Sequence, residues 1–329
     1  MTDKRLPLTV IGGFLGAGKT TLLNHWLRHA NGRRLALLVN DFGALNIDAM
    51  LIESSAGDTI ALSNGCVCCQ IGDDLSAALI RVLDAATPFD AVVIEASGVS
   101  DPWRIAQMGR ADPGLSLDGV IVLVDASAAL AQSRDPLLAD TLERQLKAAD
   151  LIVVNKCDLA GADERMALRR WIESVAGPVA QFETTQAVVP LALLSGLAMP
   201  PARECGAPDR DHAHAATHEH PSVHEHEHGH DNPDHGAHFD TWSGRPTRNF
   251  DAESLRAWLR DVPAGVLRLK GVLRTGGANS DWCEVQFAGR HGSLRAIDRP
   301  DDSAAALVAI GLRGQLPVAM LEARFSESG

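Results

Sequence analysis

Short apolar runs rich in β-branched residues recur along the first 195 residues of the chain. Uninterrupted apolar runs of this length are typical of strands that are buried on both faces of a sheet. Between them lie helical patterns such as 19–30 and 73–86, in which apolar side chains share one face. The alternation predicts an α/β domain with a mostly parallel sheet, whose ligands bind at the carboxyl ends of the strands. The predicted strands are LTVIG (8–12), LALLVN (35–40), AVVIEA (91–96), GVIVLVDA (119–126) and LIVVNK (151–156).

The pattern changes between residues 198 and 243, where apolar periodicity disappears. This segment is rich in His, Asp, Glu, Pro and Gly, and ten of the thirteen histidines fall between His212 and His238. Such a composition cannot bury a core, so it predicts a flexible linker or long loop. The chain is therefore divided into a first domain (1–197), a His-rich linker (198–243) and a second domain (244–329).

Mixed patterning returns after the linker. Residues 251–262 have the pattern of a helix, and 266–275 and 282–289 alternate like strands. The segments 303–312 and 317–325 indicate further elements of both kinds. A small α+β domain is expected here.

Composition narrows the choice of partners and compartment. The net charge of −12 argues against a nucleic acid or an anionic membrane as partner, since both attract surplus Lys and Arg. No apolar run approaches the roughly 20 residues of a membrane helix. The N-terminal apolar stretch runs directly into AGKTT, which excludes a signal peptide. Six cysteines in a chain of this length indicate a reducing compartment, and we expect a cytoplasmic protein.

The segment GGFLGAGKTT (12–21) contains the phosphate-binding loop pattern Gly13-x4-Gly18-Lys19-Thr20. A predicted strand precedes the loop and an amphipathic helix follows it, which argues against a glycine-rich turn with a stray lysine. Glycines let backbone N–H groups turn towards phosphates, Lys19 would reach the β- and γ-phosphates, and the Thr20 hydroxyl would hold Mg²⁺. The predicted phosphate-binding residues are Gly13, Gly16, Ala17, Gly18, Lys19, Thr20 and Thr21.

A base-recognition motif ends the fifth predicted strand, as Asn155-Lys156-x-Asp158. This motif resembles the guanine-recognition motif of GTPases, in which a carboxylate accepts hydrogen bonds from guanine N1–H and N2–H₂. Adenine offers no matching pair of donors and would leave the acceptor unpaired. The motif therefore favours GTP over ATP.

The strand 91–96 carries a third candidate element. Glu95 stands at its end, where an acid that contacts Mg²⁺ or the attacking water belongs, and Gly98 could offer a backbone N–H to the γ-phosphate. The alternative is an ordinary exposed glutamate at a strand end.

Three cysteines, Cys66, Cys68 and Cys69, lie within four positions in SNGCVCCQ. The spacing is not the C-x-x-C of redox dithiols, although redox chemistry and core packing remain alternatives. Thiolates are soft ligands that suit Zn²⁺ or Cu(I), and three of them with one further ligand would complete a tetrahedral site.

Five motifs in order resemble the CobW-like family of metal-chaperone GTPases: GGFLGAGKTTLLNHWL, VNDFGALNID, GCVCC, EASGVSDP and NKCD. That family includes zinc-regulated GTPases, CobW and nitrile hydratase activators, and the similarity extends loosely to a CobW-type C-terminal domain at 245–275. The resemblance implies that the three cysteines bind the metal cargo and that 39–48 is a switch beside the nucleotide. Many members read NEFGE in that switch, whereas here Asp41 and Ala44 replace the two glutamates. Asp41 keeps a carboxylate that could assist catalysis, and the fourth metal ligand stays unknown.

The linker contains HEHEHGH, in which His224, His226, His228 and His230 would point to one side of an extended chain. Imidazoles at this density bind Zn²⁺, Ni²⁺, Co²⁺ or Cu²⁺ with little discrimination, so weak metal capture is expected. A solvated polar linker is the alternative. His25 and His29 are interpreted as ordinary helix residues and Cys157 as a packing residue.

Together these features predict a GTP-hydrolysing metallochaperone with a P-loop GTPase domain, Lys19, Asp41 and Glu95 in catalysis, and zinc as cargo for a client metalloprotein. No arginine finger is identifiable, so a partner or a nucleotide-dependent homodimer would complete the site. The alternatives are a metal buffer with incidental GTP turnover, an activator that inserts cobalt or iron into one enzyme, and a small-metabolite kinase.

Overall fold

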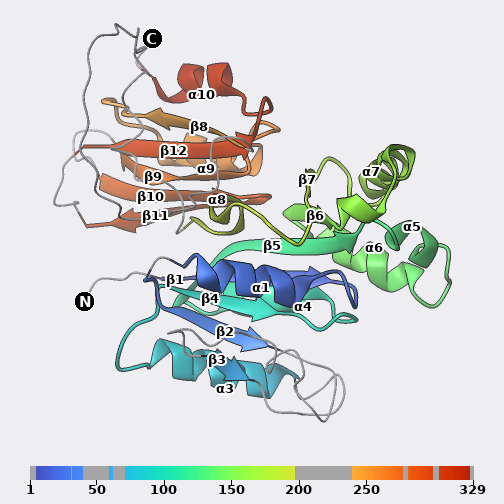
Figure 1. Cartoon of the computed structure of the whole chain (residues 1–329). Helices are drawn as coiled ribbons and strands as arrows, with labels where there is room; N and C mark the ends of the chain where they lie inside the picture. Colours follow the sequence, from blue (N-terminus) through green and yellow to red (C-terminus); the bar gives the residue numbers. More distant parts are fainter. Residues whose placement is uncertain are drawn as a thin grey trace, which may run out of the picture.

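The computed structural model describes residues 5–30, 32–39, 59–61, 71–196, 239–276, 281–298 and 304–326, with only the backbone at 59–61 and 71–74. These residues form two sheets, one parallel and one antiparallel, that lie against each other with helices around them (Figure 1).

The first sheet has seven strands within the described residues, in the order β3-β2-β4-β1-β5-β6-β7, and each pairing is parallel. The five strands predicted from the sequence are confirmed, and the apolar runs fail to reveal β3 and β7. β7 carries a single buried side chain, Phe182, and therefore has no apolar run. The strands are β1 (Leu6–Gly13), β2 (Leu35–Val39), β3 (Thr59–Ala61), β4 (Ala91–Glu95), β5 (Leu115–Asp125), β6 (Leu151–Asn155) and β7 (Ala180–Glu183).

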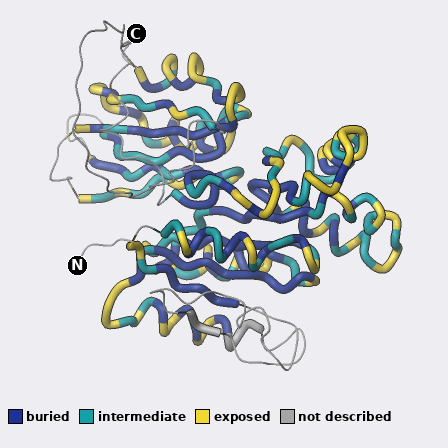
Figure 2. Tube along the Cα trace, viewed as in Figure 1, coloured by how far each residue is buried: buried dark blue, intermediate teal, exposed yellow. Residues whose placement is uncertain are grey.

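Different elements cover the two faces of this sheet. One face packs against α3 (Ile71–Leu83), α4 (Pro102–Ala111), α6 (Ala139–Ala148) and α7 (Ala162–Ala176). The other packs against α1 (Lys19–Arg28) and α8 (Leu191–Leu194), and also against Leu267, Ile310 and Leu312 of the second domain. The second domain thus completes the cover of the sheet. Figure 2 shows the resulting buried strands between helices whose outer sides are exposed. A short helix, α5 (Ala129–Gln132), and a 3₁₀ turn, η1 (Cys157–Leu159), follow β5 and β6.

The second sheet is antiparallel, in the order β11-β10-β9-β12-β8. The elements of the second domain are β8 (Phe239–Gly244), α9 (Ala252–Arg260), β9 (Arg268–Thr275), β10 (Asp281–Ala288), β11 (His291–Ile297), β12 (Ala306–Leu312) and α10 (Val318–Phe325). Phe325 anchors α10 in the core of this domain, with its ring 5.0 Å from that of Trp258 in an edge-on contact.

One boundary differs from the prediction. The composition places residues 239–243 in the linker, yet they form most of β8, which pairs with β12 from Phe239↔Leu312 to Gly244↔Leu307. The strand has one buried side chain, Trp242, so its pattern gives no periodicity, and backbone pairing with β12 makes it a strand.

A bulge in β5 lies where the first domain contacts the second. Leu8 of β1 pairs with Leu117 and the next residue, Thr9, pairs with Gly119, which leaves Asp118 as the extra residue. The positive φ of Gly119 (147°) is part of this bulge. The bulge turns Asp118 towards Arg268 of β9.

Arg268 forms a buried ion pair with Asp118 at 2.6 Å, with side-chain exposures of 6% and 13%. The same guanidinium donates to the backbone oxygens of Asp118, Leu193 and Leu194. Asp118 in turn accepts hydrogen bonds from the Ser195 hydroxyl and the Gly196 N–H. Both charges are therefore satisfied within the interface.

A second acid, Asp150, contacts the same domain. Its carboxylate accepts hydrogen bonds from the N–H groups of Val120 and Arg290, and His291 Nε2 lies 3.6 Å from it. Burial raises the pKa of Asp150 and lowers that of His291.

Among the helices in the described ranges, none combines the length and apolar character needed to cross a membrane.

We expect Arg268→Met to lower the free energy of unfolding by about 3–5 kcal/mol, because it leaves the buried Asp118 carboxylate without its cation. Urea denaturation followed by circular dichroism measures the change. The matched control is Arg144→Ala, which removes the exposed Arg144–Asp140 pair and should cost less than about 1 kcal/mol. Equal losses in the two variants would show that the Arg268 contacts do not stabilise the interface.

Candidate nucleotide-binding site

The phosphate loop connects β1 to α1, as the sequence predicts. Gly13, Gly16 and Gly18 all have positive φ, at 134°, 77° and 105°. A Cβ atom at Gly13 would collide with the backbone of Leu123, and one at Gly18 with the Asn155 amide. The loop therefore requires glycine at both positions, and it leads into the N-terminus of α1, a favourable place for an anion. Ala17 is buried in the loop, and Thr20 and Thr21 lie in the first turn of α1.

Lys19 and Glu95 meet where β1 and β4 end. Lys19 Nζ lies 3.9 Å from Glu95 Oε1 and donates a hydrogen bond to the Phe14 carbonyl at 3.4 Å. The side chains are 7% and 2% exposed, respectively. Glu95 is therefore a buried acid beside the phosphate loop, and the alternative of an ordinary exposed glutamate is wrong.

The loop after β4 packs on the phosphate loop. A Cβ atom at Gly98 would come within 2.8 Å of Leu15 N, so the two backbones approach closely. Gln145 of α6 holds this loop from behind, since its amide donates to the carbonyls of Gly98 (3.1 Å) and Ser100 (3.0 Å). The sequence reasoning missed Gln145. Its only signal is a polar residue on the buried face of α6, between Leu142 and Leu146.

Asn155 ties the base motif to the phosphate loop. Its amide donates to the Ala17 carbonyl at 2.9 Å and accepts from the Ala187 N–H at 2.8 Å. The side chain is buried, so Asn155 braces two loops around the site.

Lys156 follows Asn155 in a left-handed conformation (φ 60°), and its ammonium pairs with Asp125 at 2.7 Å. Burial alone would raise the pKa of Asp125, but the hydrogen bonds from Lys156 and Ser127 hold it below its usual value. Asp158 is exposed in the 3₁₀ turn that follows. Cys157 between them is half-buried and packs against the core as expected, and burial raises the pKa of its thiol.

A loop at 184–188 also reaches the site, and the sequence reasoning missed it. Gln186 and Ala187 have positive φ (56° and 53°) although neither is glycine. The hydroxyl of Thr184 donates to the Val188 carbonyl at 2.6 Å, and Asn155 holds the Ala187 N–H. Its signal is positional: the loop follows β7, whose end lies at the same edge of the parallel sheet as the base motif.

These residues fit a nucleoside triphosphate. The carboxyl edge of the sheet brings together backbone donors, a lysine, the threonine hydroxyls of α1, a buried acid and an exposed base-recognition carboxylate. Loops from β1, β4, β6 and β7 supply them, which is the usual place for a ligand in a parallel sheet.

The predicted ligands of the transition metal lie outside the described residues. These are Cys66, Cys68 and Cys69 together with His224, His226, His228 and His230, and Asp41 is likewise outside. Within the described ranges, no three His, Cys, Asp or Glu side chains are grouped to hold a metal ion.

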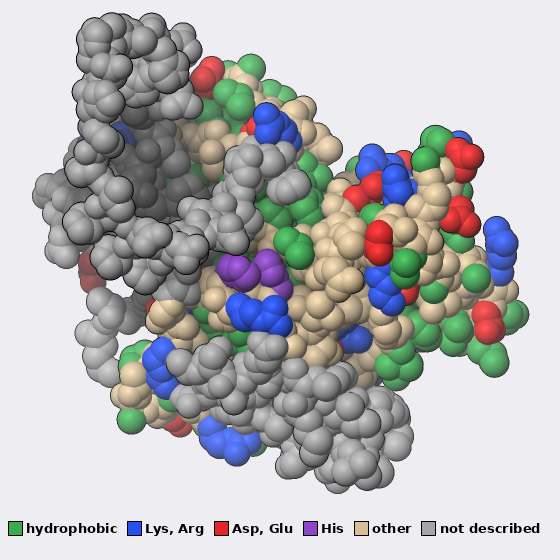
Figure 3. All heavy atoms as spheres, viewed as in Figure 1, with side chains coloured by type: hydrophobic (Ala, Val, Ile, Leu, Met, Phe, Trp, Pro, Cys, Tyr) green, Lys and Arg blue, Asp and Glu red, His purple; other side chains and the backbone are tan. Residues whose placement is uncertain are grey.

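Histidine side chains gather beside Lys or Arg on the face of the molecule near α1 (Figure 3). The rings of His25 and His29 on that helix are 4.4 Å apart, and His29 Nδ1 lies 2.7 Å from the His25 carbonyl oxygen. Burial and the neighbouring His29 lower the pKa of His25. The two rings therefore pair at the C-terminal end of α1, which His29 caps.

The family model for the CobW/HypB/UreG nucleotide-binding domain matches residues 7–182, and the model for the CobW C-terminal domain matches 239–328. The chain belongs to the CobW/HypB/UreG family. This membership confirms the resemblance inferred from the five motifs. It also confirms the P-loop fold of the first domain with an additional C-terminal sheet domain.

Several relatives carry informative names. The chain is 34% identical over 222 residues to "Zinc chaperone CobW" of Sinorhizobium sp, covering 59% of this chain and 63% of that protein. It is 37% identical over 197 residues to "Zinc chaperone YjiA" of Escherichia coli strain K12, covering 57% and 60%. The matches thus span about three fifths of the length of these relatives. A crystal structure of Zn(II)-bound YjiA GTPase from E. coli aligns over 97% of this chain and 98% of that one, with 25% identity and a TM-score of 0.46.

We expect Asn155→Ala to weaken nucleotide binding at least about tenfold, because it releases the Ala17 carbonyl and the Ala187 N–H, each worth about 1–3 kcal/mol when left unpaired. Equilibrium titration with a fluorescent guanine nucleotide measures the affinity. The control is Gln181→Ala, an amide on neighbouring β7 that contacts Arg169 of α7 and not these loops. Unchanged affinity in Asn155→Ala would contradict the bracing role.

Proposed function

We propose that this protein is a GTP-hydrolysing metallochaperone that binds zinc and delivers it to a client metalloprotein. The observation that carries the proposal is the Asn155 amide, which holds a guanine-type motif against a phosphate loop at one edge of the sheet. Membership of the family and the names of the zinc chaperone and zinc-regulated GTPase relatives support it.

In the proposed reaction, water attacks the γ-phosphate and the chain contributes positioning and charge stabilisation. The backbone of Gly13–Gly18 and the start of α1, including Thr21, cradle the phosphates, and Lys19 offsets their charge. The N–H of Gly98, positioned by Gln145, donates to the γ-phosphate. Glu95 and Asp41 supply carboxylates that orient the attacking water.

Thr20 would hold Mg²⁺, which when bound offsets the charge that develops on the β- and γ-phosphate oxygens. The described residues contain the Thr20 hydroxyl in the first turn of α1 and the buried Glu95 carboxylate at the end of β4, the strand that pairs with β1. Hydroxyl and carboxylate oxygens are the donors that this hard cation prefers.

Selectivity for guanine rests on Asp158, which would accept from the two guanine donors. Lys156 is oriented by its ion pair with Asp125, and this pairing shapes the wall beside the base. Adenine has no matching pair of donors and would leave the Asp158 carboxylate unpaired, which is the physical basis of the choice.

For the metal, Cys66, Cys68 and Cys69 form the proposed zinc site, and the histidines of the linker capture metal weakly. Thiolate ligands fit zinc and a reducing cytoplasm.

A second subunit or the client would supply the missing positive charge for fast hydrolysis, and a nucleotide-dependent homodimer is one such arrangement. The net charge of −12 disfavours nucleic acid and anionic membranes as partners. An activator specific for cobalt or iron would share the same G domain and differ in the metal retained.

We expect Asp158→Asn to weaken GTP binding by about 100-fold or more and to improve xanthosine triphosphate, because the amide presents a donor where the carboxylate accepted. Competition titration of GTP, ATP and xanthosine triphosphate measures the preference. Asp163→Asn, an exposed acid at the start of α7, is the control and should leave all three unchanged. Equal binding of ATP and GTP by the unaltered protein would contradict the guanine assignment.

We expect zinc affinity to differ between the GDP form and a non-hydrolysable GTP form by about 5–150-fold, with the same factor on nucleotide affinity when zinc is bound. Zinc competition against a chelator in the apo, GDP and GTP-analogue states measures this coupling. Replacing Cys66, Cys68 and Cys69 by Ser should remove the tight site. Deleting residues 208–236, which stops before β8, should retain it. Identical zinc affinity in the three states would favour a metal buffer.

A further inference from the structure

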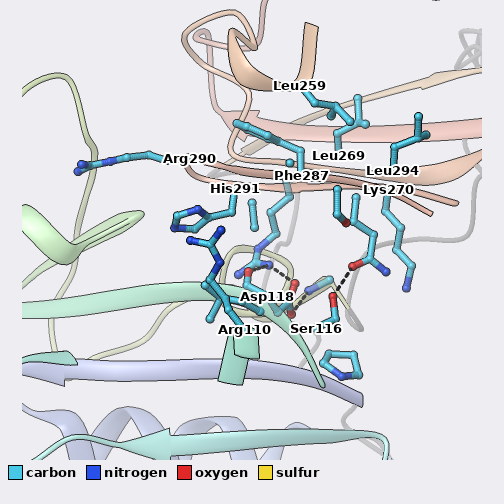
Figure 4. Close-up of a pocket in the computed structure, with 18 of the residues that line it drawn as sticks. Arg110, Ser116, Asp118, Leu259, Leu269, Lys270, Phe287, Arg290, His291 and Leu294 are labelled. Atoms are coloured by element: carbon cyan, nitrogen blue, oxygen red, sulfur yellow. Dashed lines mark hydrogen bonds and ion pairs between the residues drawn. The ribbon is translucent and has the colours of Figure 1, made fainter. Parts of the chain in front are cut away.

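A cavity of about 550 Å³ lies between the two domains, away from the nucleotide site. Its walls come from the starts of β1 and β5, from α9 and from the second sheet (Figure 4). The phosphate loop is at the other end of β1, and eight residues of strand separate the two by roughly 25 Å. The cavity is therefore a site of its own.

Cationic side chains dominate the lining. Seven Lys or Arg residues border the cavity against one acid, Asp118, and this acid is already engaged by Arg268, Ser195 and Gly196. Within the described residues, only Arg268 of the seven forms an ion pair with a carboxylate. The guanidinium of Arg290 donates to the backbone carbonyls of Lys147 and Ala149. The other five are Arg5, Arg110, Arg256, Arg260 and Lys270.

The cluster is unusual for this chain, whose net charge is −12. Like charges around a shared, partly enclosed space repel one another more strongly than they do in bulk water. A bound anion would offset this repulsion. Arginine is suited to such an anion, because its planar guanidinium donates two parallel hydrogen bonds to a carboxylate or a phosphate.

The remaining lining limits the kind of anion. Figure 4 shows Arg110 reaching from the first domain towards His291 of the second, while Leu259, Leu269 and Phe287 close the side of the second sheet. These apolar side chains suit a ligand with a carbon body as well as charged groups. The volume falls within the range of small-molecule sites, roughly 300–1,000 Å³, and is too small for a folded partner.

We infer that this inter-domain cavity binds a small organic anion that carries two or more carboxylate or phosphate groups. Arg110 binds it from the first domain, and Arg260 and Lys270 bind it from the second, with the apolar wall against its carbon body. Because the ligand contacts both domains, it also strengthens their association.

The test titrates benzene-1,3,5-tricarboxylate and pyrophosphate, separately, into full-length protein by calorimetry at fixed ionic strength without Mg²⁺. A Lys19→Ala background suppresses binding at the phosphate loop, so the outcome does not depend on GTP binding. We expect one saturable site per chain. The probe that binds more tightly shows whether the site prefers carboxylate groups or phosphate groups.

The double variant Arg110→Gln/Lys270→Gln should weaken the tighter probe at least tenfold. Arg170→Gln, an exposed arginine on α7, is the matched control and should leave its affinity unchanged. Absence of saturable binding by either probe, or equal weakening in the control, would overturn the inference. Hexaglutamate is titrated in the same way. If it binds more tightly than either probe and the double variant weakens that binding, the inference is overturned in favour of an acidic protein partner.

Discussion

The buried pair of Arg268 and Asp118 is the contact on which the arrangement of the two domains depends. Asp118 can reach Arg268 because it is the extra residue of a bulge in β5, and Gly119 permits the backbone turn that follows. Arg268 also satisfies carbonyls of α8, which brings that short helix and the second domain onto the same face of the parallel sheet. A doubly wound sheet needs cover on both faces, and here the second domain provides part of it. On that face the second domain packs beside α1 and α8, where a further helix would otherwise be needed.

Helix α6 links the two ends of the first domain. Its middle, through Gln145, holds the loop of Gly98 beside the phosphate loop, and its last carbonyls accept hydrogen bonds from Arg290 of the second domain. Arg290 also borders the cationic cavity. The nucleotide edge and the inter-domain face therefore share one helix. The two sites would be coupled only if α6 had two arrangements and a ligand at one site bound one arrangement more tightly. A ligand that binds both arrangements equally shifts no equilibrium.

The nucleotide site follows from strand topology more than from any single motif. β1, β4, β5, β6 and β7 run in the same direction, so their carboxyl ends bring Gly13, Glu95, Asp125, Asn155 and the 184–188 loop to one edge. Buried polar contacts then set the loops relative to one another: Asn155 to Ala17 and Ala187, and Gln145 to Gly98. Such contacts are costly to leave unpaired, which makes the geometry of the loops specific.

Local patterning by itself determined a large part of this protein. The apolar runs located β1, β2, β4, β5 and β6, because strands buried on both faces need uninterrupted apolar residues. The glycines and Lys19 located the phosphate loop, because the chain turns there at Gly13, Gly16 and Gly18 with positive φ, a conformation that glycine adopts most readily. β7, β8, Gln145 and the 184–188 loop carry no comparable local signal, and the bulge at Asp118 has none either. Tertiary structure alone decided which residues meet across 138 positions, as Asn155 and Ala17 do, or across 150, as Arg268 and Asp118 do. The physical reason is that a hydrogen bond or an ion pair depends on where the folded chain places its two partners, and neither partner's neighbours in the sequence encode that place.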